Sequence, residues 1–254
     1  MSSADAPVKS DTVKYNTVKH RIGKVLLPLM PVNRRTFDIL RYELHAARMR
    51  IGNRLSLRQR RTIRRLASAR DLSVNLGSGG TGLEGWVNVE FRRMKDTVLQ
   101  LDLRHPLPLT SGSAQRVFIE HVLEHLDFRT DAPALVREIY RVLQPGGTFR
   151  VIVPDMEKYA RAYVSGKRGD WNDVGWNLEA MPGDIYTPMH ILNHSFHQEG
   201  EHLFGYDFET MQWLLREAGF TKIEKMAFRQ SLDPELAIDQ DEHRKYSLYV
   251  DAVK

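Results

Sequence analysis

The stretch Val74-Asn75-Leu76-Gly77-Ser78-Gly79-Gly80 decides the fold of this chain. Its first three residues run directly into a cluster of small ones, which is the pattern of a buried strand that stops at a tight turn. Glycine lets the backbone turn sharply and approach a ligand closely, because it has no Cβ. A second strand, Trp86-Val87-Asn88-Val89-Glu90, follows and ends in a carboxylate.

A strand, a glycine turn and an acid at the tip of the next strand together indicate a nucleoside site. The turn exposes backbone N–H groups to a ligand, and the acid can accept hydrogen bonds from both ribose hydroxyls. The glycines alone are weak evidence, since any turn between a strand and a helix can use them. The interpretation therefore depends on the segments that follow.

Three further strands and two helices are expected downstream. The strands are Thr97-Val98-Leu99-Gln100-Leu101-Asp102-Leu103, residues 115–121 and residues 148–153. Helices are expected from Asp131, as N-cap, through Leu143, and near residues 157–164. This alternation predicts an α/β fold with a mainly parallel, doubly wound sheet. Ligands of such sheets lie beyond the carboxyl ends of the strands, where the predicted fold gathers Gly77, Glu90, Asp102, Glu120, His121 and Asp155.

The C-terminal part contains a long polar segment and then a regular end. Residues 166–205 are rich in histidine and aromatic residues but show weak periodicity, which suggests a lid or substrate loop. Asp207 is expected to cap a helix over residues 208–218 that Gly219 ends. Residues 221–228 and 246–253 are expected to form a closing pair of strands.

Composition limits the classes of function. The chain has 254 residues, a formal net charge of +5, a pI near 9.4 and no cysteine. The absence of cysteine excludes disulfides, thiolate metal sites and cysteine nucleophiles, and is typical of a cytoplasmic protein. The first ten residues lack the apolar run of a signal peptide, and the apolar stretch at residues 25–32 is too short to span a bilayer.

Residues 34–70 are strongly basic. They contain twelve arginines against only Asp38 and Glu43, with apolar residues at helical spacing. One interpretation is a solvated helical face whose arginine stems cover the core. The other is a platform for an acidic membrane surface, an anionic lipid-linked glycan or RNA. Nucleic acid is the least favoured partner, because Phe37 and Tyr42 are the only aromatic residues available for base stacking there.

Taken in order, these segments resemble the class I S-adenosylmethionine-dependent methyltransferases, most closely the type 11 methyltransferase-like group. The resemblance rests on an ordered set of motifs over about residues 72–228, which is more specific than any single motif. The motifs are Asn75-Leu76-Gly77-Ser78-Gly79, Gly85-Trp86-Val87-Asn88-Val89-Glu90, Leu101-Asp102-Leu103 with Pro106-Leu107-Pro108, Glu120-His121-Val122-Leu123-Glu124-His125-Leu126, and Leu143-Gln144-Pro145-Gly146-Gly147.

The resemblance implies a Rossmann-like, seven-stranded sheet with an antiparallel last strand, within a methyltransferase domain at residues 71–254 after a basic extension at residues 1–70. It implies that S-adenosylmethionine is the cofactor. Gly77 and Gly79 would flank its methionine portion, Glu90 its ribose, and Asp102 with Leu103 its adenine. Glu120 and His121 would line the floor near the methyl group, and Asn75 and Ser78 complete the expected cofactor site.

One departure concerns the connection between the first two strands. Nine residues, Gly77 to Gly85, are too few for the crossover helix of a parallel pair, so a short turn must serve. The missing helix also argues against a dinucleotide site, because pyrophosphate binds at a helix N-terminus. A dehydrogenase that uses NAD is accordingly the less favoured enzyme.

The expected reaction is methyl transfer to a hydroxyl (EC 2.1.1.-), with a histidine as general base. His121, His190 and His194 are the candidates. A sugar or a lipid-linked saccharide of the cell envelope is the first choice of acceptor, and another small metabolite with a nitrogen or oxygen acceptor stays open. So do a non-catalytic cofactor-binding protein and a nucleic-acid-binding module.

The remaining histidines and acids near the site are expected to play three different roles. His190, His194 and His197 have spacings that one helical face could present to a metal, but the surrounding sequence looks irregular, and we expect no metal site. Glu124 and His125 are expected to be structural and to bond backbone. Asp155 is either a helix N-cap or a catalytic group.

Overall fold

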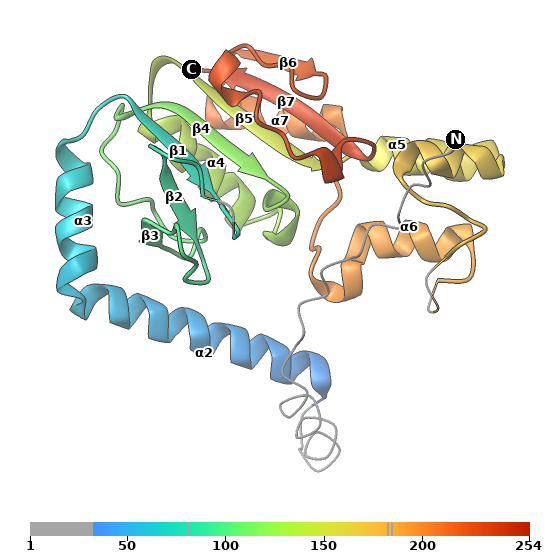
Figure 1. Cartoon of the computed structure of the whole chain (residues 1–254), viewed down its shortest axis with the longest axis horizontal. Coiled ribbons are helices and arrows are strands. Elements are labelled where there is room, and N and C mark those ends of the chain that lie inside the picture. Colours follow the sequence, from blue (N-terminus) through green and yellow to red (C-terminus); the bar gives the residue numbers. More distant parts are fainter. Residues whose placement is uncertain (1–32, 81, 182, 184) are drawn as a thin grey trace, which may run out of the picture. The chain divides into compact units, whose positions relative to one another are not determined.

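The computed structural model describes residues 33–80, 82–181, 183 and 185–254 (Figure 1). The expected lead at residues 1–20 and the apolar stretch at residues 25–32 lie outside the described residues. The chain divides into two compact units, one ending at Arg48 and one running from Met49 to Lys254. All the site residues treated below belong to the second unit.

A seven-stranded sheet forms the centre of the second unit, in the order β3-β2-β1-β4-β5-β7-β6 (Figure 1). The first five strands pair in parallel, and β7 pairs antiparallel with both β5 and β6. The predicted fold class, including the antiparallel last strand, is therefore confirmed. The strands are β1 (Leu72–Leu76), β2 (Val87–Glu90), β3 (Leu99–Gln100), β4 (Ala114–Glu120), β5 (Leu143–Pro154), β6 (Lys222–Met226) and β7 (Ser247–Val253).

The order of the strands brings the expected site residues to one edge. β1 lies between β2 and β4. The chain adds β2 and β3 on one side of β1 and then crosses to add β4 and β5 on the other side. Ligands of open parallel sheets bind outside the carboxyl ends of the strands at such a switch point. Gly77, Glu90 and His121 follow or end these three neighbouring strands.

The main core lies on the face of the sheet that α4 (Asp131–Val142) and α7 (Phe208–Ala218) cover. Leu135 and Ile139 from α4 and Leu215 from α7 pack there with alternate residues of the central strands. The predicted caps of α7 are confirmed: the Asp207 side chain accepts from the Thr210 N–H, and Gly219 ends the helix with a φ of 111°. The predicted N-cap of α4 is wrong, because Thr130 occupies that position and Asp131 is the first helical residue.

The opposite face is covered by the segment between β6 and β7, which includes the short helices η5 (Pro234–Leu236) and η6 (Asp241–His243). Leu236 packs there with Phe118, Ile152 and Tyr249. A buried ionic group accompanies this small core: Arg150 donates to both carboxylate oxygens of Asp239, at 2.7 and 2.6 Å, and to Asp251 at 2.7 Å.

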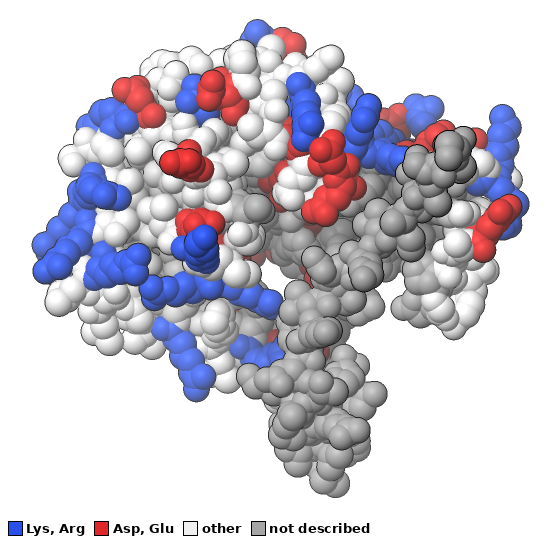
Figure 2. Space-filling model, viewed as in Figure 1, with Lys and Arg blue, Asp and Glu red and all other residues white. Residues whose placement is uncertain are grey.

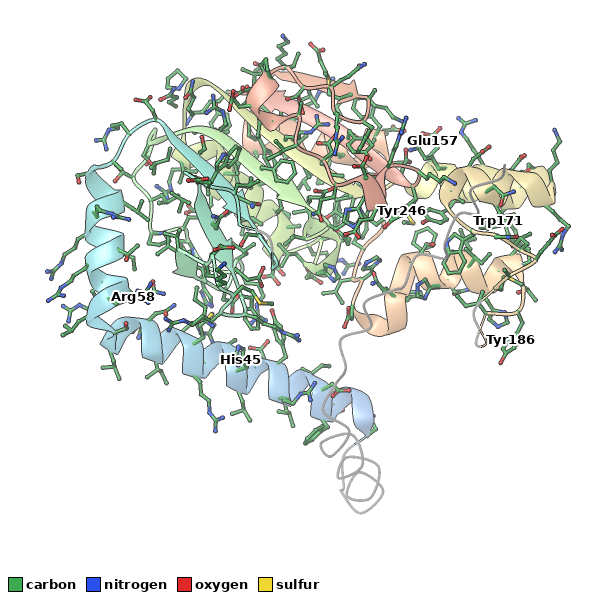
Figure 3. All side chains as sticks on the ribbon, in the orientation of Figure 1. His45, Arg58, Glu157, Trp171, Tyr186 and Tyr246 are labelled. Carbon is green, nitrogen blue, oxygen red and sulfur yellow. The ribbon has the colours of Figure 1, made fainter. Side chains whose placement is uncertain are left out.

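Residues 166–205 are more regular than their sequence suggests. They contain η3 (Arg168–Val174), α6 (Pro188–His197) and η4 (Gln198–Gly200). Together with α5 (Met156–Ser165) they bury a core of their own around Tyr159, Ile191 and Trp171, the last of which is labelled in Figure 3. The expectation of irregular structure around the α6 histidines is therefore wrong. The Thr187 side chain caps α6, and Pro188 is its first residue.

The predicted helices of the basic segment are α2 (Arg34–Leu55) and α3 (Leu57–Ser68). In α3, Leu66 is buried and Ile63 packs against the main core, whereas Leu57 is 65% exposed. The arginines of α3 are exposed and form a basic surface (Figure 2). None of the helices in the described part of the chain is long and apolar enough to cross a bilayer.

Candidate active site

The glycine turn after β1 is shaped by two positive φ angles. Gly77 has a φ of 76° and Gly79 a φ of 55°, which is the left-handed region that glycine tolerates best. A Cβ on Gly77 would lie 2.2 Å from Cγ2 of Val122, so the turn passes directly against the segment after β4. A Cβ on Gly79 would meet nothing within 4 Å, so the backbone there borders open space.

Glu90 faces this turn from the end of β2. Its Oε2 accepts the Gly79 N–H at 2.9 Å, and its Oε1 accepts the Arg92 N–H at 3.1 Å. The side chain is half-buried. A carboxylate can accept about four hydrogen bonds, so Glu90 retains acceptor capacity for two hydroxyls of a ligand.

The short connection between β1 and β2 is held by an asparagine. The Asn88 Oδ1 accepts the Leu83 N–H at 3.0 Å, and its Nδ2 donates to the Leu83 carbonyl at 2.8 Å. Asn75 donates to the same Oδ1 at 3.3 Å. These bonds hold the short connection in place where a longer one would contain a crossover helix. They also give Asn75 a structural role at the end of β1. The sequence did not reveal the part played by Asn88.

Two further predicted cofactor residues differ in how their polar atoms are bonded. The Ser78 hydroxyl is buried and has no hydrogen-bond partner among the described residues. The Asp102 carboxylate is 2% exposed and accepts from the Arg104 backbone N–H and guanidinium at 2.9 to 3.1 Å. Burial acts to raise the pKa of Asp102, but the bonds from Arg104 outweigh it and leave that pKa below its ordinary value. Asp102 thus stabilises the turn that follows it, and Leu103 packs against the main core.

Glu120, the last residue of β4, is tied to the segment before β7. It accepts from His243 Nδ1 at 2.9 Å and from the backbone and side-chain nitrogens of Gln240 at 3.2 and 3.1 Å. Burial acts to raise the pKa of Glu120, and the bonds from His243 and Gln240 outweigh that effect and lower it. Glu120 is therefore an ionised, fixed acceptor in the floor of the site.

His121 occupies the centre of this region. It has a φ of 52°, an uncommon conformation for a residue with a side chain. Its Nε2 lies 2.8 Å from Ser247 Oγ and its Nδ1 lies 3.2 Å from Glu124 Oε1. Its ring stacks on His243 at 3.9 Å and meets the edge of Tyr246, whose position is labelled in Figure 3.

This arrangement is one that general bases use. A carboxylate facing Nδ1 holds the proton on that nitrogen and leaves the lone pair on Nε2. The Ser247 hydroxyl then donates to Nε2, at the place where the hydroxyl of an acceptor could donate instead. Strained backbone of this kind is found preferentially at functional sites. His243, Ser247 and Tyr246 were missed from the sequence, because they lie in or beside a polar segment without periodicity.

The other two histidine candidates lie on α6. His190 Nδ1 is 3.0 Å from the Thr187 hydroxyl, and its ring meets Tyr186 (Figure 3); His194 meets the edge of Trp176. Within the described residues, no hydrogen bond, ion pair or ring contact joins either one to His121. Asp155 caps α5 by accepting the Glu157 N–H at 3.1 Å, which is the first of its two predicted alternatives.

Parts of the chain are similar to known proteins. The family described as "Methyltransferase domain" matches residues 85–151. The solved structures that resemble the chain include a SAM-dependent methyltransferase, possible histamine N-methyltransferase, from Thermotoga maritima, at 16% identity and a TM-score of 0.44, over 85% of this chain and 95% of that one. A second, from Mesorhizobium loti, has 19% identity and a TM-score of 0.45 over 78% of this chain and 99% of that one. No curated protein matches the chain.

Residues 85–151 match the methyltransferase-domain family, and the sheet order is the one expected of a class I S-adenosylmethionine-dependent methyltransferase. The residues present fit S-adenosylmethionine as a cofactor: the glycine turn borders open space at Gly79, Glu90 keeps free acceptor capacity, and the buried Ser78 hydroxyl lacks a partner among the described residues. The expected assignments of individual residues to the cofactor remain predictions.

Proposed function

We propose that this chain is an S-adenosylmethionine-dependent methyltransferase, that it methylates a hydroxyl group and that His121 is the general base. The observation that carries the proposal is the position of His121 between Glu124 and Ser247, at the carboxyl end of the strand next to the glycine turn. An alcohol must lose its proton as the methyl group arrives, and a histidine held by a carboxylate is suited to accept it. An amine that is already deprotonated has no such need.

The chemistry of the transfer itself requires mainly alignment. S-adenosylmethionine supplies an activated methyl group on a sulfonium. Glu90 would hold the ribose, and Gly77 and Gly79 would hold the methionine portion, so that these residues would orient the sulfonium. Bringing the acceptor oxygen to about 3 Å from the methyl carbon, in line, can supply much of the rate acceleration. His121 Nε2 takes the hydroxyl proton, and Glu124 stabilises the imidazolium that forms.

We propose a sugar or a lipid-linked saccharide as the acceptor. Two features support this choice. The exposed arginines of α3, among them Arg58, Arg61 and Arg65, offer a basic surface to an anionic glycan or an anionic lipid headgroup (Figure 2). Residues 166–205 pack with α5 around the buried Trp171 and Ile191, beside the carboxyl end of β5, where a substrate segment is expected. They leave aromatic and histidine side chains such as Tyr186 and His190 exposed to a substrate.

The test is an acceptor screen with purified protein. S-adenosylhomocysteine release and the mass gain of one methyl group would be followed on nucleotide sugars, lipid-linked saccharides and small amines. The proposal expects methylated hydroxyls and loss of turnover in His121→Asn. Methylation confined to amines, or unchanged turnover in His121→Asn, would overturn it. Binding of S-adenosylmethionine with no turnover on any acceptor would instead favour a non-catalytic binding protein.

We propose that the basic surface of α3 contacts the surface of a membrane. Co-sedimentation with vesicles would test it, using anionic phosphatidylglycerol vesicles against neutral phosphatidylcholine vesicles. Binding to the anionic vesicles should weaken with salt and in an Arg61→Ala, Arg65→Ala double variant. Equal binding to both vesicles, or none to either, would overturn this part of the proposal.

A further inference from the structure

Three side chains meet next to the proposed general base. Glu124 and His125 belong to η2 (Leu123–His125), directly after β4, and His202 follows η4. One ligand atom from each of the three lies within 4.8 Å of those of the other two. The Leu203 N–H donates to the Glu124 carbonyl at 2.8 Å, which fixes the two segments beside each other.

The Glu124 carboxylate is buried and only partly compensated. Its side chain is 1% exposed, and His121 Nδ1 faces its Oε1 at 3.2 Å. Oε2 has no hydrogen-bond partner among the described residues. A buried carboxylate with unfilled acceptor positions costs several kcal/mol. Such a group can accept a cation that the polypeptide does not supply.

Both histidines present a free lone pair. His125 Nδ1 lies 3.0 Å from the Glu201 carbonyl oxygen, and His202 Nδ1 lies 2.9 Å from the Ser195 carbonyl oxygen. A carbonyl can only accept, so each Nδ1 carries the proton and each Nε2 keeps its lone pair in the neutral ring. Histidines that bind metals are commonly oriented by such a bond from the other ring nitrogen.

We propose that Glu124, His125 and His202 bind one divalent transition-metal ion. Two imidazoles and one carboxylate suit Zn²⁺ or Fe²⁺, whereas Mg²⁺ and Ca²⁺ prefer sites made of oxygen atoms. Three protein ligands leave at least one coordination position open to water or to another ligand. The ion would share the Glu124 carboxylate with His121 and join the end of β4 to the segment after α6, and the proposal is independent of the identity of the methyl acceptor.

The site differs from the one considered in the sequence. His190, His194 and His197 lie on α6, but they do not form a group that could share an ion within the described part of the chain. The new site uses Glu124 and His125, which the sequence analysis assigned to structural roles. It also uses His202, which lies 77 residues beyond His125 and could not be joined to it from spacing.

The test uses the full-length protein after removal of metals with a chelator. Zn²⁺, Co²⁺ and Mg²⁺ would be titrated calorimetrically, with metal content measured by mass spectrometry and thermal unfolding followed in parallel. We expect one equivalent of Zn²⁺ or Co²⁺ to bind and to raise Tm, and Mg²⁺ not to compete. The Co²⁺ absorption spectrum should show nitrogen and oxygen ligands.

Substitutions of the proposed ligands test whether Zn²⁺ binds at this site. Glu124→Gln keeps the shape of the side chain, and His125→Ala changes a half-buried residue that is less able to affect folding. Each should weaken Zn²⁺ binding at least about tenfold, since even residues behind metal ligands cost this much when mutated. His197→Ala, on α6, should bind as the wild type does. No saturable Zn²⁺ binding, or equal affinity in Glu124→Gln and His125→Ala, would overturn the proposal.

Discussion

The imidazole rings of His121 and His243 stack at 3.9 Å, with 28° between their planes, and each faces a different carboxylate. His243 Nδ1 lies 2.9 Å from Glu120 Oε1, and His121 Nδ1 lies 3.2 Å from Glu124 Oε1. Glu120 and Glu124 come from consecutive segments of the chain, whereas His243 comes from the segment before β7. His243, which is distant in the sequence, therefore fixes the plane of the His121 ring by stacking on it.

Replacing His121 by asparagine should remove the general base while keeping the backbone. Asparagine tolerates the left-handed φ of this position better than alanine does. We expect kcat to fall about 10²- to 10⁴-fold, the usual contribution of a positioned base. S-adenosylmethionine affinity, measured calorimetrically, and Tm should stay close to those of the wild type.

His243→Asn and His190→Asn separate the roles of the histidines. His243→Asn should reduce kcat less than His121→Asn does. It removes the stacking partner that orients the His121 ring, but the base itself stays. His190→Asn should have little effect if His121 is the base. If kcat fell strongly in His190→Asn but stayed normal in His121→Asn, the general base would be His190 on α6 and not His121.

Glu90→Gln should weaken cofactor binding specifically. The amide oxygen can still accept the Gly79 N–H, but the charge that strengthens bonds from ribose hydroxyls is lost. Hydrogen bonds to a charged group contribute about 1.5–3 kcal/mol each, so we expect S-adenosylmethionine affinity to fall about tenfold to a hundredfold in calorimetry. The control Glu224→Gln, on β6 with 47% of its side chain exposed, should bind normally. Equal affinity in both variants would contradict a ribose contact at Glu90.

Gly77→Ala should destabilise the fold, whereas Gly80→Ala should not. A Cβ at Gly77 meets Val122 at 2.2 Å and sits on a backbone with a φ of 76°, while a Cβ at Gly80 meets nothing within 4 Å. Left-handed φ costs a residue with a side chain roughly 1–2 kcal/mol, and overpacking roughly 1–3 kcal/mol more. Urea unfolding should therefore show a loss of at least about 2 kcal/mol for Gly77→Ala alone. In the Gly77→Ala, Val122→Ala double variant, the part of the lost stability that comes from overpacking should be recovered, but not the part that comes from the left-handed φ.

The sequence predicts the central strands and the turn well, because each is encoded locally. The run from Val74 to Gly80 contains both the apolar strand and the residues that its turn requires. The short spacing to Glu90 also correctly excludes a crossover helix. Only the means of holding that connection, the side chain of Asn88, needed the structure.

The parts that the sequence predicts poorly depend on contacts between distant segments. His243 reaches Glu120 across 123 positions, and His202 meets Glu124 through a backbone pairing that no periodicity encodes. The helix α6 is a different case. Thr187 followed by Pro188 is a helix-start signal, but the polar composition of the segment obscured it.

Asp239→Asn should cost far more stability than Asp241→Asn. Asp239 and Arg150 are completely buried and joined by two hydrogen bonds, whereas Asp241 is 71% exposed beside Arg229. Weakening one partner of a buried ion pair typically costs 3–5 kcal/mol, so we expect roughly that loss in urea unfolding for Asp239→Asn. An exposed pair contributes about 0–1 kcal/mol, which sets the expectation for Asp241→Asn. Similar losses in the two variants would show that the Arg150 group is not what attaches the β6–β7 segment to the sheet.

The ion pair between Glu138 and Arg141 should make stability depend on pH. Hydrogen bonds from the Arg141 side chain are the largest cause that lowers the pKa of Glu138 below its ordinary value of 4.5. Because the pKa is lower in the folded state, the pair stabilises the protein above pH 4.5, and that stability is lost as the pH falls through the folded-state pKa. Glu138→Gln should therefore cost about 1 kcal/mol at neutral pH and progressively less in acid, as measured by urea unfolding. The exposed Glu224→Gln should give a small change at every pH, and a loss for Glu138→Gln that grows in acid would contradict the assigned sign.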